Sequence, residues 1–143
     1  MNRRDVVQRI VLGGTILVVM PSVLTSCSKD PGPDAGPGPG PGSSPITIDL
    51  SIAGNSSLNT TGGSKIVQNI IVINTGSDIF VALSSICTHQ GCTVGYNSGA
   101  GNIQCPCHGS VYATTGSVIN GPAPRALKSY PVSLTGNILT ITF

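Results

Sequence analysis

Glutamate and tryptophan are both absent from this chain, aromatic residues make up only 3% of it, and charged residues only 8%. Strong helix formers are therefore scarce, whereas isoleucine, valine and threonine are plentiful. The 19 glycines and 11 prolines supply residues that favour turns. β-Branched residues separated by turn residues are typical of short strands, so this composition argues against a helical protein and predicts a β protein.

A strong excess of charge of either sign is also lacking. The formal net charge is +2, but Arg3, Arg4, Arg9 and Asp5 lie in an N-terminal segment that we expect to be removed. The remaining basic residues are Lys29, Lys65, Arg125 and Lys128, and the remaining acidic residues are Asp30, Asp34, Asp49 and Asp78. These charges cancel, and a neutral surface has no general attraction for a polyanion. No nucleic-acid partner is expected.

The apolar run at residues 10–20 is too short to cross a membrane, because a transmembrane helix needs about 20 residues. Its length suits the core of a signal peptide, and Pro21 ends it. The sequence Leu-Thr-Ser-Cys that ends at Cys27 resembles the lipobox of bacterial lipoproteins. This resemblance implies a signal peptide over residues 1–26 and a lipid on Cys27 that anchors the protein to a membrane, at the periplasmic face of the bacterial cell envelope. The alternatives are an uncleaved anchor, or an ordinary signal peptide with an idle cysteine.

Two further features belong to this N-terminal region. Arg3-Arg4 followed by Val6-Val7 loosely resembles a twin-arginine export signal, although two arginines are also common in ordinary basic signal starts. In residues 31–45, eleven of the fifteen residues are proline or glycine. Such a segment cannot bury an apolar face, so residues 27–45 are predicted to be a linker between the lipid and a domain at residues 46–143.

From residue 46 the pattern changes to the alternation of a half-buried strand, with Ile46, Ile48, Leu50 and Ile52 on one face. Further β-rich runs lie at residues 65–73, 79–83, 118–120, 127–134 and 138–143. Turn residues separate them at 74–76, 98–101 and 135–137. This pattern predicts an all-β domain, an antiparallel β-sandwich or barrel.

Both histidines and four of the five cysteines lie in two short segments, Cys-Thr-His-Gln-Gly-Cys at 87–92 and Cys-Pro-Cys-His-Gly-Ser at 105–110. Thiolates and neutral imidazoles are ligands for a structural zinc ion, and a framework of disulfides alone is also conceivable. Zinc leaves two cysteines without a role, and Cys-x-His is tighter than the usual zinc spacing. In a Rieske [2Fe-2S] centre, two cysteines bind one iron and two histidines bind the other.

These two segments resemble the cluster-binding loops of the Rieske subunits of cytochrome bc complexes, including the chloroplast kind. The resemblance continues through Gly116 to Gly-Pro-Ala-Pro at 121–124, which is similar to the proline-rich loop of that family. It implies the Rieske β-sandwich with two cluster-binding loops at one tip and one [2Fe-2S] cluster per subunit. The implied metal ligands are Cys87, His89, Cys105 and His108. The resemblance also implies a disulfide between Cys92 and Cys107.

The cysteine pair separates this chain from Rieske ferredoxins and ring-hydroxylating oxygenases, which lack it. Ser110 and Tyr112 match residues that, in high-potential members, donate hydrogen bonds to a bridging sulfide and to the sulfur of the first cysteine ligand, here Cys87. Such donors favour the reduced state and therefore raise the potential. Without the neighbouring motif, the two residues would be read as a turn serine and an interface tyrosine.

The resemblance implies one-electron transfer, with His108 corresponding to the histidine that contacts quinol. The expected partners are a cytochrome b-type quinol-oxidising subunit and a c-type cytochrome or cupredoxin, so the chain would be a subunit rather than a complete enzyme. Two alternatives are the small Rieske subunit of a molybdenum oxidase such as arsenite oxidase, and a stand-alone exported electron carrier. A surface lipoprotein held together by disulfides is a further, non-redox alternative.

Overall fold

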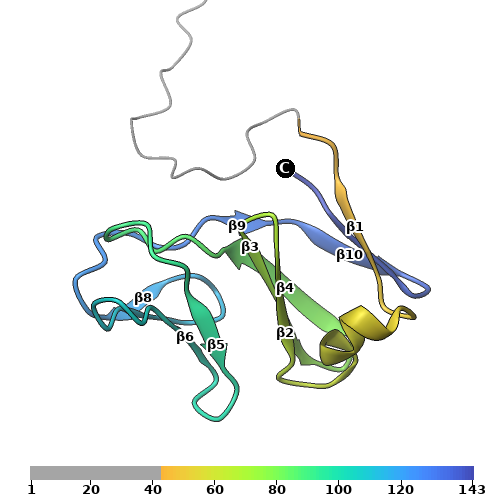
Figure 1. Cartoon of the computed structure of the whole chain (residues 1–143), viewed down its shortest axis with the longest axis horizontal. Helices are drawn as coiled ribbons and strands as arrows, with labels where there is room; N and C mark the ends of the chain where they lie inside the picture. The colour runs from red at the N-terminus through yellow and green to blue at the C-terminus, as the bar shows by residue number, and fades with distance from the viewer. Residues whose placement is uncertain (1–42) are drawn as a thin grey trace, which may run out of the picture. The chain divides into compact units, whose positions relative to one another are not determined.

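The computed structural model describes residues 43–143, which form an all-β domain of three antiparallel sheets (Figure 1). The predicted signal peptide, the lipidation site at Cys27 and all but the last three residues of the predicted linker lie outside the described residues. Within the described part of the chain, no helix is long and apolar enough to cross a membrane.

The first sheet has the strand order β1-β11-β10, the second β2-β3-β4-β9 and the third β5-β6-β7-β8. The strands are β1 (Ile46–Asp49), β2 (Ser64–Val67), β3 (Ile70–Gly76), β4 (Ile79–Ser84), β5 (Gly95–Asn97), β6 (Asn102–Gln104), β7 (Val111–Tyr112), β8 (Val118–Asn120), β9 (Ser129–Tyr130), β10 (Val132–Thr135) and β11 (Ile138–Ile141). In Figure 1 the second sheet lies between the other two. The domain is therefore a stack of three sheets.

Strand β3 shows how one sheet can serve two cores. Ile70 and Val72 pack with β1 and β11, whereas Ile71 and Ile73 pack with the cysteine-containing loops. Neighbouring side chains of a strand point to opposite faces, so an unbroken apolar run fits a strand that is covered on both sides. The predicted antiparallel β fold is confirmed, and the central sheet has a hydrophobic core on each face.

Two of the predicted β-rich runs are each divided between two strands. The run at residues 65–73 is a hairpin of β2 and β3, turned by Gln68 and Asn69, which both adopt positive φ angles. The run at 127–134 breaks at Pro131, so that β9 pairs with β4 while β10 pairs with β11. The turn at Gln68 and Asn69 lies between the β-branched residues Val67 and Ile70, whereas Pro131 marks the second break in the sequence itself.

The first predicted strand ends earlier than the alternation suggested. Strand β1 stops at Asp49, and Ile52, which was expected on the buried face, is 56% exposed. A 3-10 helix, η1 (Ala53–Asn59), follows and buries Leu58. The Asp49 carboxylate accepts hydrogen bonds from the backbone and hydroxyl of Ser51, which turns the chain out of the sheet.

Candidate metal centre

Two loops with the same backbone hydrogen-bond pattern form the centre. In the first loop the Cys87 amide donates to the Cys92 carbonyl, at 2.8 Å, and the Gly91 amide donates to the Cys87 carbonyl, at 2.9 Å. In the second loop the Cys105 amide donates to the Ser110 carbonyl, at 2.8 Å, and the Gly109 amide donates to the Cys105 carbonyl, at 3.1 Å. Gly91 and Gly109 occupy equivalent positions with φ angles of 76° and 75°, which a residue with a side chain rarely adopts. The two motifs therefore fold as a structural repeat.

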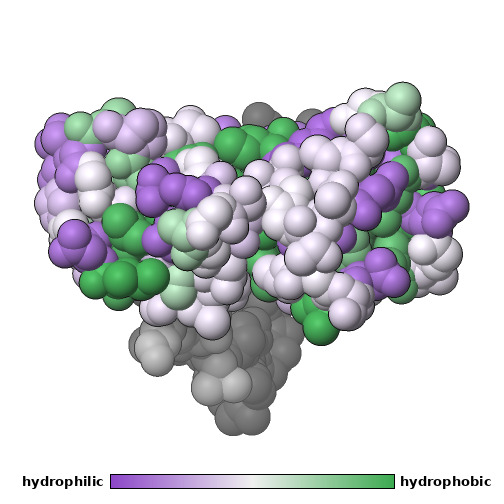
Figure 2. All heavy atoms as spheres, turned by 90° about the horizontal axis from the view of Figure 1, so that it is seen from below, coloured by the Kyte–Doolittle hydropathy of each residue, from purple (hydrophilic) through white to green (hydrophobic). Residues whose placement is uncertain are grey.

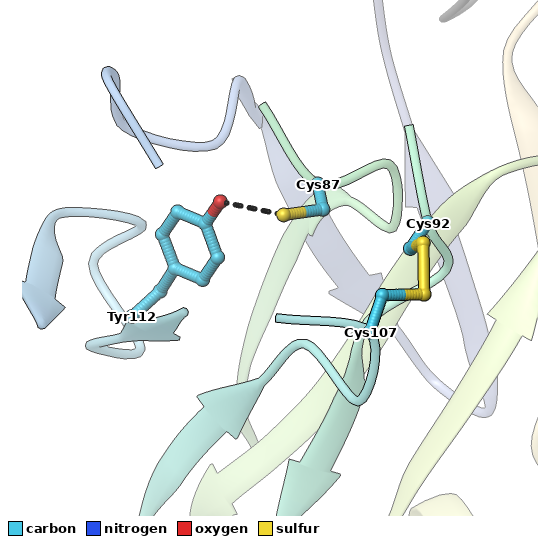
Figure 3. Close-up of a disulfide and its surroundings, with 4 residues drawn as sticks. All are labelled: Cys87, Cys92, Cys107 and Tyr112. Atoms are coloured by element: carbon cyan, nitrogen blue, oxygen red, sulfur yellow. Dashed lines mark hydrogen bonds between the residues drawn. A yellow bond between two sulfur atoms is a disulfide. The ribbon is translucent and has the colours of Figure 1, made fainter. Parts of the chain in front are cut away.

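A disulfide between Cys92 and Cys107 joins the two loops (Figure 3). This pairing is the one that the resemblance implied, and it is confirmed. It leaves Cys87 and Cys105 as the free cysteines of the described domain, each with 2% of its surface exposed. Both thiols pack in the core between the second and third sheets.

The two free thiols influence each other's ionisation. Burial acts to raise the pKa of Cys87, but hydrogen bonds from Tyr112, the His89 backbone, Cys105 and Ser110 outweigh it and hold the pKa below its ordinary value. Burial and the neighbouring Cys87 raise the pKa of Cys105. Two adjacent thiols resist simultaneous ionisation, because two thiolates repel each other. A cation bound by both would stabilise the two negative charges.

The histidines lie beside each other at the same tip of the domain. Their ring centroids are 4.8 Å apart, with the ring planes nearly perpendicular. His108 is exposed and His89 is half-buried. The Nδ1 atom of His89 is buried without a hydrogen-bond partner, a costly arrangement for a polar atom unless a ligand satisfies it. The residues present therefore fit a metal group bound by two thiolates and two imidazoles.

A different set of sulfurs also lies close together. The Sγ atoms of Cys92, Cys105 and Cys107 are within 4.8 Å of one another. Cys92 and Cys107 share a disulfide, so neither can supply a thiolate to a metal.

Tyr112 contacts the Cys87 thiol and the neighbouring residue, Thr88. Its hydroxyl oxygen lies 3.2 Å from Cys87 Sγ, as Figure 3 shows, and the side chain is fully buried. The Thr88 amide donates to the same oxygen at 3.2 Å, and the Thr88 hydroxyl donates to the Arg125 carbonyl at 2.7 Å. Burial and the neighbouring Cys87 raise the pKa of Tyr112, so its hydroxyl keeps its proton.

The segment Gly-Pro-Ala-Pro covers the second loop at close range. The Ala123 amide donates to the hydroxyl oxygen of Ser110, at 3.2 Å, and Ser110 is fully buried. Gly121 has a φ of 102°, and a Cβ at that position would lie 2.5 Å from the Ser110 Cα. Only glycine allows the proline-rich segment to pack this closely against the loop.

Reasoning from sequence did not identify Thr88 or Gly121 as functional residues. Thr88 stands between two expected ligands, but no spacing indicates that its hydroxyl reaches the Arg125 carbonyl 37 residues away. Gly121 was noted only as the first residue of the Gly-Pro-Ala-Pro segment that resembles the proline-rich loop, with no role of its own. The structure brings all the other candidate residues of the domain together at one tip.

Comparison with known proteins agrees with this geometry. The sequence profile of the Rieske [2Fe-2S] domain matches residues 50–131, more than half of the chain. The chain belongs to the Rieske [2Fe-2S] domain family. Its cofactor is accordingly a [2Fe-2S] cluster, and the two free thiols and two adjacent histidines supply a donor set suited to it.

Curated relatives in this family are iron-sulfur subunits of cytochrome b6-f complexes. The subunit from Chlorobaculum thiosulfatiphilum is 37% identical over 99 residues, covering 66% of this chain and 54% of the relative. The subunit from Synechococcus sp. (strain JA-3-3Ab) is 44% identical over 75 residues, covering 52% and 44%. The chain thus spans about half the length of these relatives.

A solved structure is also similar. The plasma membrane Rieske protein PetC3 from Synechocystis PCC 6803 is 33% identical, with a TM-score of 0.54. The match covers 62% of this chain and 93% of that protein. The likeness therefore extends over almost the whole of a Rieske protein from a membrane.

Proposed function

We propose that this protein transfers single electrons through a high-potential Rieske cluster at the tip of the domain. The observation that carries this proposal is the pair of disulfide-linked loops, which places two buried free thiols beside two histidines at the protein surface. When bound, the [2Fe-2S] cluster supplies a redox couple that accepts and releases one electron. The protein holds that group, shields one side of it and leaves the other side accessible.

The thiolates of Cys87 and Cys105 are assigned to one iron, and His89 and His108 to the other. The buried, unpartnered Nδ1 of His89 supports that atom as the ligand. His108 is the exposed one of the four. Its imidazole is therefore the group that a reaction partner can touch, and we assign it the contact with quinol. Its outer nitrogen can hold a proton there, which couples proton and electron uptake.

We assign to the hydrogen bonds from Tyr112 and Ser110 the role of raising the reduction potential of the cluster. The Thr88 hydroxyl donates a hydrogen bond to the Arg125 carbonyl, and the Thr88 amide donates one to the Tyr112 oxygen. The Tyr112 hydroxyl can therefore donate to Cys87 Sγ or to the Thr88 hydroxyl oxygen, each 3.2 Å away. Ser110 accepts from the Ala123 amide and keeps its own proton for donation. Donors aimed at sulfur stabilise added negative charge and therefore favour the reduced state.

The proposed reaction takes electrons from quinol and delivers them to a c-type cytochrome or cupredoxin, with a cytochrome b-type subunit providing the quinol site. The names of the relatives as cytochrome b6-f subunits support this assignment. We place the domain at the periplasmic face of the bacterial envelope, held by a lipid on Cys27 and the linker of residues 27–45. Delivery of electrons from a molybdenum subunit is the second candidate, favoured by the Arg3-Arg4 export pattern alone.

A redox titration of the full-length, cluster-loaded protein, followed by EPR at several pH values, tests the proposal. Rieske potentials range from about −150 to +300 mV. We expect a value near the upper end that falls as the pH rises in the alkaline range. A value near the lower end, independent of pH around neutrality, would show that Ser110 and Tyr112 are not engaged and that quinol is not the donor.

A further inference from the structure

A free thiol lies beside the disulfide that joins the two loops. The Sγ atom of Cys105 is within 4.8 Å of both sulfurs of the Cys92–Cys107 bond. Cys105 is buried, so water does not separate it from that bond. Exchange between a thiol and a disulfide requires this kind of placement, because the attacking sulfur must reach a sulfur of the existing bond.

The other free thiol, Cys87, is directed elsewhere. Figure 3 shows its sulfur pointing towards Tyr112 and away from the disulfide, and the Tyr112 hydroxyl oxygen lies 3.2 Å from that sulfur. Cys87 is also not a member of the close group of three sulfurs. Cys105 is therefore the free thiol that is placed to attack the disulfide.

We propose that, when the domain holds no cluster, Cys105 attacks Cys92 and moves the disulfide from Cys92–Cys107 to Cys92–Cys105. The Cys105 thiolate forms the new bond to Cys92 Sγ while the bond from Cys92 to Cys107 breaks. Cys107 then takes up the proton that Cys105 released. One disulfide is present before and after, so the exchange needs no oxidant or reductant. This inference rests on the proposed function, because it treats Cys105 as a ligand of the cluster.

Chain entropy hardly distinguishes the two pairings. The existing disulfide spans 15 residues, and Cys105 precedes Cys107 by two positions, so the new loop is only slightly shorter. The entropy of loop closure depends on the logarithm of loop length, which changes little here. Attack on Cys107 would instead join two residues separated only by Pro106 and leave the two loops unconnected. Cys92 is therefore the expected target.

The exchange would move a thiol from the core to the surface. Cys105 has 2% of its surface exposed, whereas Cys107 is exposed. The rearranged domain would present a reactive thiol to solvent and would lack one of its two cysteine ligands for the cluster. In the loaded protein the Cys105 thiolate is bound to iron and is not free to attack. Cluster binding therefore protects the disulfide that joins the loops.

The exchange is expected within one chain rather than between two chains. Cys105 is buried, so the disulfide of a second molecule cannot reach it. On the face that Figure 2 shows, hydrophobic residues form separate groups among residues of intermediate hydropathy. That face gives two copies no broad apolar surface through which to associate. The rate of exchange should therefore not depend on protein concentration.

The test locates the free thiols in the full-length protein with Cys27→Ser, which removes the fifth cysteine. A chelator removes the cluster anaerobically, and gel filtration removes the released sulfide. At successive times, free thiols are trapped with N-ethylmaleimide in denaturant and located by tandem mass spectrometry. We expect label on Cys87 and Cys105 at first, and transfer of the second label to Cys107 in about half of the chains. Loaded protein should keep the first pattern.

Two variants distinguish the two thiols. Cluster-free Cys105→Ser should show no label on Cys107, whereas Cys87→Ser, the matched control, should still show it. The proposal is wrong if Cys107 stays unlabelled in the cluster-free protein, if it is labelled without Cys105, or if the rate rises with protein concentration. Equally fast labelling of Cys107 in the loaded protein would show that Cys105 is not a ligand, and the ligand assignment of the proposed function would then fail.

Discussion

The two cores on either side of the central sheet are built differently. The core towards β1 and β11 is aliphatic and aromatic, and the strands around it are mostly four to seven residues long. The core towards the loops includes Cys87 and Cys105, and its outer sheet has strands of two or three residues. Such short strands supply few ladder hydrogen bonds. The loop side is therefore stabilised by the disulfide and by side-chain hydrogen bonds, whereas the other side is stabilised mainly by apolar burial.

The largest expected effect on stability comes from the aliphatic core. Leu139 on β11 is fully buried, and Leu139→Ala should lower the free energy of unfolding by about 3 kcal/mol through lost burial and the cavity left behind. The thiols of Cys87 and Cys105, to which we assign the cluster, lie in the other core, so its EPR signal should be unchanged below the unfolding transition. A denaturant titration that follows both the unfolding of the domain and the EPR signal checks this. An altered EPR spectrum in the folded variant would show that the cores are not independent.

Removing the disulfide should destabilise the loop side of the domain. The Cys92–Cys107 bond spans 15 residues, and a loop of that length is worth about 3 kcal/mol. The double variant Cys92→Ser/Cys107→Ser should lose its cluster absorbance faster on heating, while the far-UV circular dichroism keeps its β character. Leu139→Ala is the matched comparison, because it should lose cluster and fold together. Equal rates of cluster loss in the wild type and the double variant would refute this division of roles.

A smaller effect is expected where the proline-rich segment meets the second loop. Gly121→Ala places a methyl group 2.5 Å from the Ser110 Cα and forces alanine to a φ of 102°. We expect a loss of about 2 kcal/mol and a shifted EPR spectrum. Gly95→Ala is the control, since nothing lies within 4 Å of its Cβ position. Spectra identical to wild type in both variants would mean that the contact does not matter.

The smallest expected effect concerns the reduction potential of the cluster on the loop side. Tyr112→Phe removes the hydroxyl 3.2 Å from Cys87 Sγ while keeping the ring in the core. Loss of a hydrogen bond to a charged group is worth about 1.5 kcal/mol, or about 60 mV for one electron, so the potential should fall. Tyr96→Phe changes a tyrosine against the same core and should leave the potential alone. A fall of equal size in both variants would point to a general change in polarity.

The two sides also differ in how far the sequence predicted them. The two loops follow motifs of fixed spacing. The resemblance that these motifs carry implied the disulfide and the two free cysteines, and both features are present. The hairpin turn at Gln68 and Asn69 was missed because neither residue interrupts a β-rich run as strongly as glycine or proline does. The contact from Thr88 to the Arg125 carbonyl could not be predicted, because it depends on how distant segments pack.

Cluster composition and ligation together test the central claim most directly. Iron and acid-labile sulfide should be measured on the full-length protein, and pulsed EPR should be recorded on the reduced protein after labelling of histidine with ¹⁵N. The account predicts two iron and two sulfide ions per chain, with two histidine nitrogens coupled to the reduced cluster. A single zinc ion, or a cluster without histidine nitrogen coupling, would contradict the assignment of His89 and His108 as ligands beside Cys87 and Cys105.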